Sequence, residues 1–317
     1  MDRTRRRILD RLVDGPVSGP ELAASLDISR AAVWKHIEAL REMGLEIDSS
    51  DGGYVLHSIP EYGGAAIAAG YPADHEIVYE ETIGSTNDRA RTLAADGATE
   101  TLVLANEQPT GRGRLGRSWT GPPGGIYCSL LLYPTLSPVD VPVLTTVAGV
   151  AVAEALEDAG FDPSIKWPND ILVDGKKVAG VLTEMEGEAD RVNWVIIGFG
   201  INANVDEVDL PPRGSSLESI RGSPIERRQI VHDVVDRIDW YTTHLDEAVD
   251  AARAYSETIG RRIRVETATE TVTGKAIDIV YPGALEVETP AGNRRVHTGD
   301  CEHVRGDDGS YADPSSN

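Results

Sequence analysis

The strongest signal in the sequence is one stretch, which reads Glu107-Gln108-Pro109-Thr110-Gly111-Arg112-Gly113-Arg114-Leu115-Gly116-Arg117-Ser118-Trp119. Its residues 111–117 contain three glycines and three arginines. Each glycine inside a helix costs roughly 1 kcal/mol, so the stretch does not favour a helix. Glycines let backbone N–H groups turn towards an anion, and arginines supply forked donors. The stretch lies between two predicted strands and therefore predicts an anion-binding loop. A flexible Arg-Gly segment that binds nucleic acid is the alternative.

A second motif, Lys166-Trp167-Pro168-Asn169-Asp170, lies at the end of the strand predicted over 164–167. A carboxylate at the end of a strand is suitably placed to hold Mg²⁺ beside a nucleotide. Lys177 begins the strand predicted over 177–186, where it would face a cleft. The alternative is a plain hairpin with an exposed lysine and aspartate.

Two further motifs place small and polar residues beside the same predicted strands. Gly198-Phe199-Gly200-Ile201-Asn202 carries glycines that would let a ligand approach a strand closely. Ser85-Thr86-Asn87 offers hydroxyl and amide groups at the start of a helix predicted over 86–95. The simpler interpretation of this second motif is a helix N-cap.

The first 60 residues predict a winged helix-turn-helix domain. Apolar positions repeat with a helical period in three segments, and a glycine-rich hairpin follows over 46–56. The third helix, Arg30 to Met43, is the predicted recognition helix for a DNA major groove. Arg3, Arg5, Arg6 and Arg7 are expected to precede the first helix. The DNA-binding residues predicted on the outward face are Ser29, Arg30, Trp34 and Lys35. A winged helix used for protein contact is the alternative.

The remaining chain divides into two predicted domains. Strand and helix patterns alternate over residues 61–260, which indicates an α+β domain around a mixed sheet. Short strands separated by Gly and Pro turns fill residues 261–308 and indicate a small SH3-like β-barrel.

Composition narrows the class of protein. The chain has 317 residues and two cysteines, and it contains no run of about 18 apolar residues. We therefore expect a cytoplasmic protein without a membrane span or a disulfide framework. The formal charge is −22, with 52 acidic and 30 basic residues, of which only five are Lys. This balance predicts a surface adapted to high salt, as in a halophile.

Taken in order and spacing, these motifs resemble those of the biotin protein ligases. The resemblance extends from Arg5 to Arg305, and the winged helix makes it the bifunctional kind that also represses a biotin operon. It implies a central domain with a class II synthetase-like mixed sheet. The motifs that carry it are Ser85-Thr86-Asn87, Gly111–Trp119, Lys166–Asp170, Lys177-Val178-Ala179-Gly180 and Gly198–Asn202.

The resemblance also implies roles for individual residues. Arg114, Lys177 and Asp170 would be catalytic, and Asp170 would hold Mg²⁺. Trp240 is a candidate aromatic contact for adenine that no motif fixes. Biotin would be bound by Ser85, Thr86, Asn87, Gln108, Arg112, Gly113, Arg114 and Lys177, and ATP by Arg117, Trp119, Asn169 and Arg305.

The implied reaction uses biotin and ATP with Mg²⁺. It forms biotinyl-5′-adenylate and then transfers biotin to one lysine of a carboxylase's biotin carrier domain. The implied partners are that carrier domain, operator DNA and a second copy of the chain in a homodimer. Two alternatives remain open, namely a lipoate-type protein ligase and a ligand-sensing regulator without ligase activity. Arg114, Asp170 and Lys177 together favour a ligase, because sensing alone does not require a carboxylate for Mg²⁺.

Overall fold

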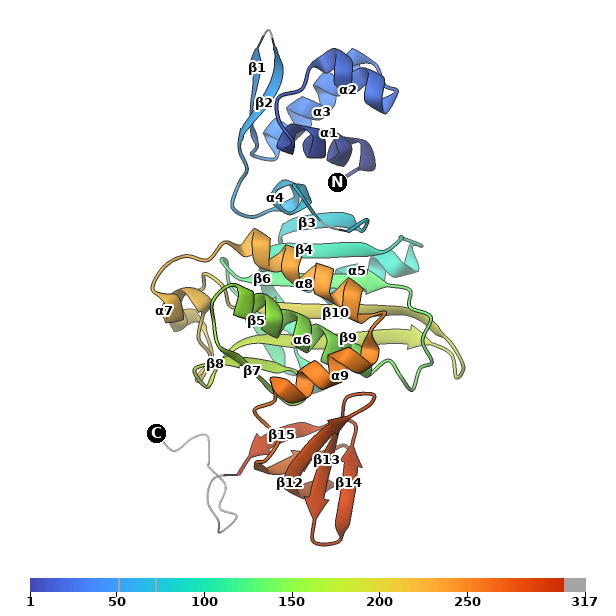
Figure 1. The fold of residues 1–317 in the computed structure, drawn as a ribbon, viewed down its shortest axis with the longest axis vertical. Coiled ribbons are helices and arrows are strands. Elements are labelled where there is room, and N and C mark those ends of the chain that lie inside the picture. The colour runs from blue at the N-terminus through green and yellow to red at the C-terminus, as the bar shows by residue number, and fades with distance from the viewer. Residues whose placement is uncertain (51, 72, 305–317) are drawn as a thin grey trace.

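The structure is a computed structural model that describes residues 1–50, 52–71 and 73–304. Three groups of elements follow one another along the longest axis of the molecule (Figure 1). The N-terminal helices and hairpin lie at one end, an eight-stranded sheet with its helices lies in the middle, and a five-stranded sheet lies at the other end. This arrangement agrees with the predicted α+β class and with the order of the predicted folds. Arg305 lies outside the described residues.

The N-terminal part is a three-helix unit with a two-stranded wing. Ser18 and Glu21 form a capping box at α2, and the side chain of Ser29 caps α3. The predicted start of the first helix is wrong, because the helix begins at Arg3 and includes the arginines expected to precede it. Asp2 supplies the cap that allows this early start. The elements are α1 (Arg3–Val13), α2 (Gly19–Leu26), α3 (Arg30–Glu42), β1 (Glu46–Ser50) and β2 (Gly53–Ser58).

The central sheet has the strand order β3-β4-β6-β10-β9-β8-β7, with β5 paired to β4. Among the strands that the structure describes in this sheet, only β3 and β4 pair in parallel, and the other strand pairs are antiparallel. The strand Asp170–Val173 was not predicted, since a four-residue strand between two tight turns shows little alternation. The strands are β3 (Glu76–Thr82), β4 (Thr101–Arg112), β5 (Ser118–Gly121), β6 (Ile126–Leu132), β7 (Pro163–Lys166), β8 (Asp170–Val173), β9 (Lys176–Gly187) and β10 (Val192–Ile201).

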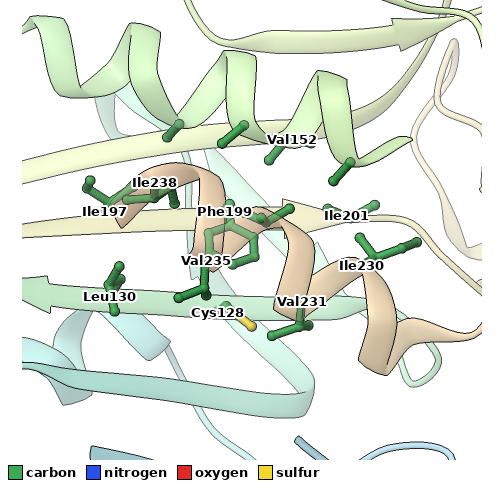
Figure 2. Packing of buried hydrophobic residues seen from close by; sticks show 14 of the residues in the cluster. Cys128, Leu130, Val152, Ile197, Phe199, Ile201, Ile230, Val231, Val235 and Ile238 are labelled. Atoms are coloured by element: carbon green, nitrogen blue, oxygen red, sulfur yellow. The ribbon is translucent and has the colours of Figure 1, made fainter. Parts of the chain in front are cut away.

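Helices cover both faces of this sheet. Figure 2 shows Ile197, Phe199 and Ile201 of β10 facing the helices α6 and α8. The alternate residue Ile196 packs instead with Ala90 of α5 on the opposite face. Burial on both faces explains why the central strands are almost continuously apolar. The helices are α4 (Gly64–Ala68), α5 (Thr86–Ala95), α6 (Val143–Asp158), α7 (Leu217–Arg221), α8 (Arg227–Tyr241) and α9 (Leu245–Ala254).

The C-terminal sheet is antiparallel, with the order β14-β13-β12-β11-β15. Four strands follow one another, and the fifth returns beside the first, as expected for the predicted small barrel. The strands are β11 (Arg262–Glu266), β12 (Thr271–Val280), β13 (Ala284–Thr289), β14 (Gly292–Val296) and β15 (Asp300–His303).

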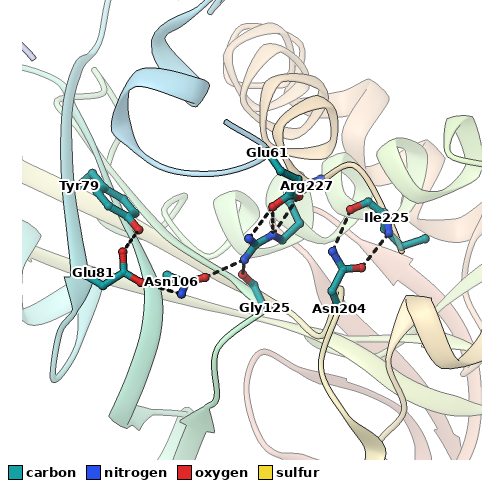
Figure 3. A network of polar contacts seen from close by, with 8 residues as sticks. All are labelled: Glu61, Tyr79, Glu81, Asn106, Gly125, Asn204, Ile225 and Arg227. Atoms are coloured by element: carbon teal, nitrogen blue, oxygen red, sulfur yellow. Dashed lines mark hydrogen bonds and ion pairs between the residues drawn. The ribbon is translucent and has the colours of Figure 1, made fainter. Parts of the chain in front are cut away.

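Arg227 joins the segment that follows the wing to the central sheet. Its side chain is nearly buried and makes a bidentate ion pair with Glu61, with the shortest contact at 2.6 Å (Figure 3). The same guanidinium donates to Asn106 of β4 and to the carbonyl oxygen of Gly125. A buried charge is tolerated when it is paired and fully hydrogen-bonded, so this contact fixes where the chain enters the central domain.

Candidate functional site

A cavity of about 1340 Å³ lies between the central sheet and the C-terminal sheet. Its walls come from the start of α5, the β4–β5 hairpin, strands β8, β9 and β10, and the C-terminal strands β11 and β15. The predicted residues that line it are Ser85, Thr86, Asn87, Gln108, Arg112, Gly113, Arg114, Arg117, Trp119, Asn169, Asp170 and Lys177. These predicted residues come from segments about 90 residues apart in the chain, Ser85 to Lys177, and they meet at one site as their shared chemistry predicted.

One end of the cavity is polar but uncharged. The side-chain oxygen of Gln108 accepts from Thr86, at 2.8 Å from the backbone nitrogen and 3.0 Å from Oγ1. The hydroxyl of Ser129 lies 2.7 Å from Thr86 Oγ1 and 2.5 Å from Asn87 Oδ1. These side chains are buried and held by one another, so they present fixed donors and acceptors to a neutral polar ligand.

Two glycines make room at this uncharged end. A Cβ atom added at Gly198 would lie 2.2 Å from Oδ1 of Asn87. One added at Gly111 would lie 2.1 Å from Nε2 of Gln108. Both distances are far below van der Waals contact, so only glycine permits these amides to sit against the strands.

Trp119 closes the middle of the cavity from the β5 side. Its indole ring packs on Gly180 and Gly200, where an added Cβ would lie 3.2 Å and 3.0 Å from ring atoms. The ammonium of Lys177 lies 5.1 Å from the ring centroid. The indole Nε1 is buried and has no hydrogen-bond partner among the described residues. An unpaired donor at a cavity wall is a candidate ligand contact.

Lys177 and Asp170 form the charged centre of the site. Lys177 Nζ lies 2.5 Å from Asp170 Oδ1, and both side chains are about one-third exposed, at 34% and 28%. Asn169 is fixed beside them, because its amide donates to the carbonyl oxygen of Val181 at 2.8 Å.

Asp170 could hold Mg²⁺ only as a single protein ligand, as is usual at nucleotide sites. Among the residues that the structure describes, no group of three or more acidic, Cys or His side chains could hold a metal ion. Mg²⁺ commonly takes one or two carboxylates, and nucleotide phosphates and water complete its ligands. A single carboxylate at Asp170, on the wall of the cavity, fits that donor set.

The Arg-Gly stretch is a hairpin that covers the cavity. The prediction of a loop across the whole stretch is wrong, since β4 continues to Arg112 and pairs with β5 through Gly111 and Trp119. Only residues 113–117 form the turn. Arg117 makes a bidentate ion pair with Asp300 of β15, with both distances at 3.1 Å. Arg114 donates to Thr298 at 2.8 Å and to Asn169 at 3.3 Å.

The cavity concentrates positive charge in an acidic protein. The lining has four more cationic than acidic side chains, whereas the whole chain carries −22. Such a surplus favours a polyanionic ligand. The cations are Arg112, Arg114, Arg117, Lys166, Lys177, Arg213, Arg261 and Arg262, and the acids are Asp170, Asp209, Glu257 and Glu302.

Comparisons with known proteins agree with this site. Three family descriptions match the chain: an HTH domain over residues 4–55, the biotin/lipoate A/B protein ligase family over 79–202, and a biotin protein ligase C-terminal domain over 258–304. A bifunctional ligase/repressor BirA of Bacillus spizizenii is 38% identical over 90% of this chain and 93% of its own length. The chain belongs to the biotin protein ligase family.

Other members agree over smaller parts of the chain. The bifunctional ligase/repressor BirA of Escherichia coli is 32% identical over 61% of both proteins. The biotin protein ligase of Aquifex aeolicus, solved in complex with biotin and ATP, has a TM-score of 0.61 at 28% identity. It covers 72% of this chain and 97% of its own.

Several cavity residues of this biotin ligase family member were missed by the sequence analysis. Arg213 lines the cavity from the segment before α7 and adopts a left-handed backbone with a φ of 71°. Its carbonyl oxygen accepts from the backbone nitrogen of Lys177 at 3.0 Å, which ties the segment to the charged centre. Lys166 was quoted in a motif but given no role. A non-glycine residue in this conformation leaves no sequence signal, although it is frequent at functional sites.

Trp240 does not belong to the site. It lies on α8, on the other face of the sheet, and stacks on His244 with ring centroids 4.0 Å apart. The sequence predicts a helix at this position but does not show which face of the sheet the helix covers. It therefore could not exclude Trp240 from the site.

The outward face of α3 carries the predicted DNA-contacting side chains. Arg30, Trp34 and Lys35 are exposed, whereas Ser29 uses its hydroxyl to cap the helix. Arg41 is unsuited to phosphate contact, because it pairs with Glu38 at 2.5 Å and donates to the carbonyl oxygen of Ile47 at 2.8 Å. Arg6 is likewise committed, since it donates to carbonyl oxygens of the segment before β3.

Proposed function

We propose that this chain is an ATP-dependent biotin protein ligase that also acts as a biotin-responsive repressor. The observation that carries the proposal is the union of two unlike regions in one cavity. A neutral hydrogen-bonding end suits the ureido ring of biotin, and a cationic centre suits the phosphates of ATP. The likeness to ligases named for biotin over almost the whole chain supports the same conclusion.

The neutral end would bind biotin. Ser85, Thr86, Asn87 and Gln108 supply donors and acceptors for the ureido group without a charge. Arg112, Gly113 and Arg114 of the hairpin would then lie over the valerate chain. The fixed network among these side chains means that little reorganisation accompanies binding.

The cationic centre would bring together the carboxylate of biotin and the α-phosphate of ATP. A carboxylate oxygen attacks phosphorus and pyrophosphate leaves, so two anions must approach each other. Lys177 and Arg114 would neutralise the charge that develops on the phosphoryl oxygens. Bound Mg²⁺ at Asp170 would supply further charge neutralisation on the phosphates. Arg117, Trp119 and Asn169, with Arg305, would hold the nucleotide.

The second step would use an amine from outside the chain. A carrier lysine attacks the carbonyl carbon of the mixed anhydride, and AMP leaves. Cys128 of β6 also borders the cavity, but its side chain lies with Phe199 on the α8 side of the sheet. Burial raises its pKa to about 12, so its thiol stays protonated and is a poor nucleophile. This favours direct transfer to the carrier domain over transfer through a covalent cysteine intermediate.

The winged helix supports the repressor role. Arg30, Trp34 and Lys35 form an exposed face on α3, and two such helices in a homodimer could contact two operator half-sites. The first 60 residues nevertheless carry ten acidic and eight basic side chains. We therefore propose that DNA binding requires the dimer with ligand bound.

Two further features, the adaptation to high salt in the cytoplasm and the domain limits, remain part of the proposal. The acidic surface suits a cytoplasm with high salt, where carboxylates keep the protein hydrated. We keep the domain limits 1–60, 61–260 and 261–308 as a proposal, which the presence of one sheet within each range supports. Among the residues that the structure describes, no helix is long and apolar enough to cross a membrane.

Exchange of labelled pyrophosphate into ATP tests the ligase. Purified protein with Mg²⁺ and high KCl should catalyse exchange when biotin is added and remain inactive without it. Exchange supported by lipoate and not by biotin would identify the lipoate-type ligase instead. No exchange with either acid would leave a ligand-sensing regulator.

A further inference from the structure

The hairpin over the cavity is held from the side of α5 by one carboxylate. Asp88 is the third residue of α5, and its backbone nitrogen donates to the side chain of Ser85 at 3.3 Å. Its Oδ2 lies 2.9 Å from a guanidinium nitrogen of Arg112, the last residue of β4. Arg112 immediately precedes the turn that carries Arg114 over the charged centre.

A second arginine fixes the position of this carboxylate. Arg91, one turn further along α5, donates to Asp88 Oδ1 at 2.7 Å. Its other nitrogen donates to Glu184 of β9 at 2.8 Å. The second oxygen of Glu184 accepts from Asn87 at 2.8 Å, so the network ends at the neutral floor of the cavity. Asp88 is therefore held by its helix and by the central sheet, and it can serve as a fixed anchor.

The far side of the hairpin turn has its own anchor. Arg117 pairs with Asp300, and Arg114 reaches Thr298, both on the C-terminal side of the cavity. The turn at residues 113–117 is thus suspended between α5 and the C-terminal sheet. A short glycine-containing turn held at both ends can close over a ligand and open when one end is released.

We propose that Asp88 is a positioning residue that keeps the hairpin closed through Arg112 and so sets how long the acyl-adenylate stays bound. This inference rests on the proposed ligase function. The pair is partly exposed, at 59% for Arg112 and 36% for Asp88. Pairs of that exposure contribute modestly, which corresponds to release about two- to fivefold faster when the charge is lost. Salt screens the pair, so the difference shrinks as KCl rises.

Asp88→Asn tests the anchor, because the amide keeps the shape but loses the charge. Pre-formed biotinyl-adenylate should leave this variant about two- to fivefold faster in low salt, while single-turnover adenylation stays within about twofold of wild type. The matched control is Glu80→Gln. It breaks the ion pair between Glu80 of β3 and Arg89 of α5, which are 3.0 Å apart and 39% and 35% exposed. This pair does not involve the hairpin. The control should release adenylate at the wild-type rate.

A double-mutant cycle with Arg112→Gln separates this role from a general effect on α5. If Asp88 acts through Arg112, Asp88→Asn adds nothing to release in the Arg112→Gln background. Asp88→Glu should restore slow release at least in part. Wild-type release from Asp88→Asn, or an equal acceleration in both backgrounds, would overturn the inference.

Hydrogen exchange of the free protein gives a readout that requires no catalysis. Backbone amides of residues 113–119 should exchange faster in Asp88→Asn than in wild type and in Glu80→Gln. Unchanged exchange there would overturn the anchor even if the ligase proposal holds. Faster exchange in a protein that forms no adenylate would support the anchor and contradict the proposed function.

Discussion

The cavity and the recognition helix both display cations, but their surroundings differ. Among the described residues, Lys166 and Arg213 line the cavity without a carboxylate within 4 Å, and the lining as a whole is positive. On the winged helix, Arg6 and Arg41 are used to hold the fold, which leaves Arg30 and Lys35 within a net acidic domain. Pairing alone does not separate the two regions, because Arg112, Arg117 and Lys177 of the cavity are also ion-paired. An arginine in the sequence thus indicates a phosphate site where its surroundings carry a surplus of cations.

This contrast predicts tight, local binding of a nucleotide and weak binding of DNA. A cation enclosed in a cavity acts through a lower effective dielectric than one on a helix surface. The two regions should therefore respond independently to mutation, with the larger effects in the cavity.

The largest effect is expected from Lys177→Ala. Loss of the ammonium should slow single-turnover adenylate formation by about 10²–10³-fold, as for other donors that stabilise charge in the transition state. Biotin affinity should change by only a few-fold, because Lys177 acts as phosphate charge develops. The adjacent Lys176→Ala is the matched control, since Lys176 pairs with Glu207 and does not line the cavity. Near-normal adenylation by Lys177→Ala would remove Lys177 from the mechanism.

Gly198→Ala should cause the next largest effect, at the neutral end. The new methyl group would overlap Asn87 Oδ1, and overpacking of this kind typically costs 1–3 kcal/mol. Biotin binding, measured by calorimetry, should weaken by about tenfold or more, while ATP binding is retained. Gly149→Ala is the control, because its added Cβ would lie 3.9 Å from Ile165. Normal biotin affinity in Gly198→Ala would place biotin elsewhere.

A smaller effect is expected from the double change Arg30→Ala and Lys35→Ala. Operator binding by the ligand-bound dimer should weaken at low salt, and the salt dependence should lose about two units of slope. Ligation should be unchanged. Arg11→Ala removes an exposed cation from α1 and serves as the control in an anisotropy titration. Equal losses from both proteins would indicate a general charge effect, not contact through α3.

The smallest effect concerns His303 of β15. Burial, and then the charges of Lys166 and Arg261, lower its pKa from 6.5 to about 4. The folded protein thus favours neutral His303, and its contribution to stability is complete above pH 6.5 and is lost as the pH falls towards 4. His303→Gln should reduce this loss by about 1–2 kcal/mol. Thermal midpoints across this range, with exposed His297→Gln as control, measure the difference; parallel curves for all three proteins would contradict it.

Much of the site could be predicted because its residues lie in short motifs with distinctive chemistry. Lys166–Asp170 and Gly111–Trp119 each combine residues that a plain turn does not require. Arg213 could not be predicted, since it reaches the cavity only through a left-handed backbone and contacts between distant segments. The structural role of Arg6 was missed for the same reason, because its partners are backbone carbonyl oxygens that any sequence provides, and Arg41 also donates to one such oxygen besides its pair with Glu38.

The fold shows the same division. Long periodic segments such as α5 and β6 were predicted nearly to their ends. The short elements β8, β15, α4 and α7 were not, because they contain five residues or fewer and form through tertiary contacts.

Mass spectrometry of a biotin carrier domain tests the separation of the two regions most directly. The carrier is incubated with ATP, Mg²⁺, biotin and each of three proteins: wild type, Lys177→Ala, and the double variant of Arg30 and Lys35. We expect wild type and the double variant to attach one biotinyl group to one lysine at equal rates, and Lys177→Ala to leave the carrier unmodified over the same time. Normal labelling by Lys177→Ala, or loss of labelling in the double variant, would contradict the account.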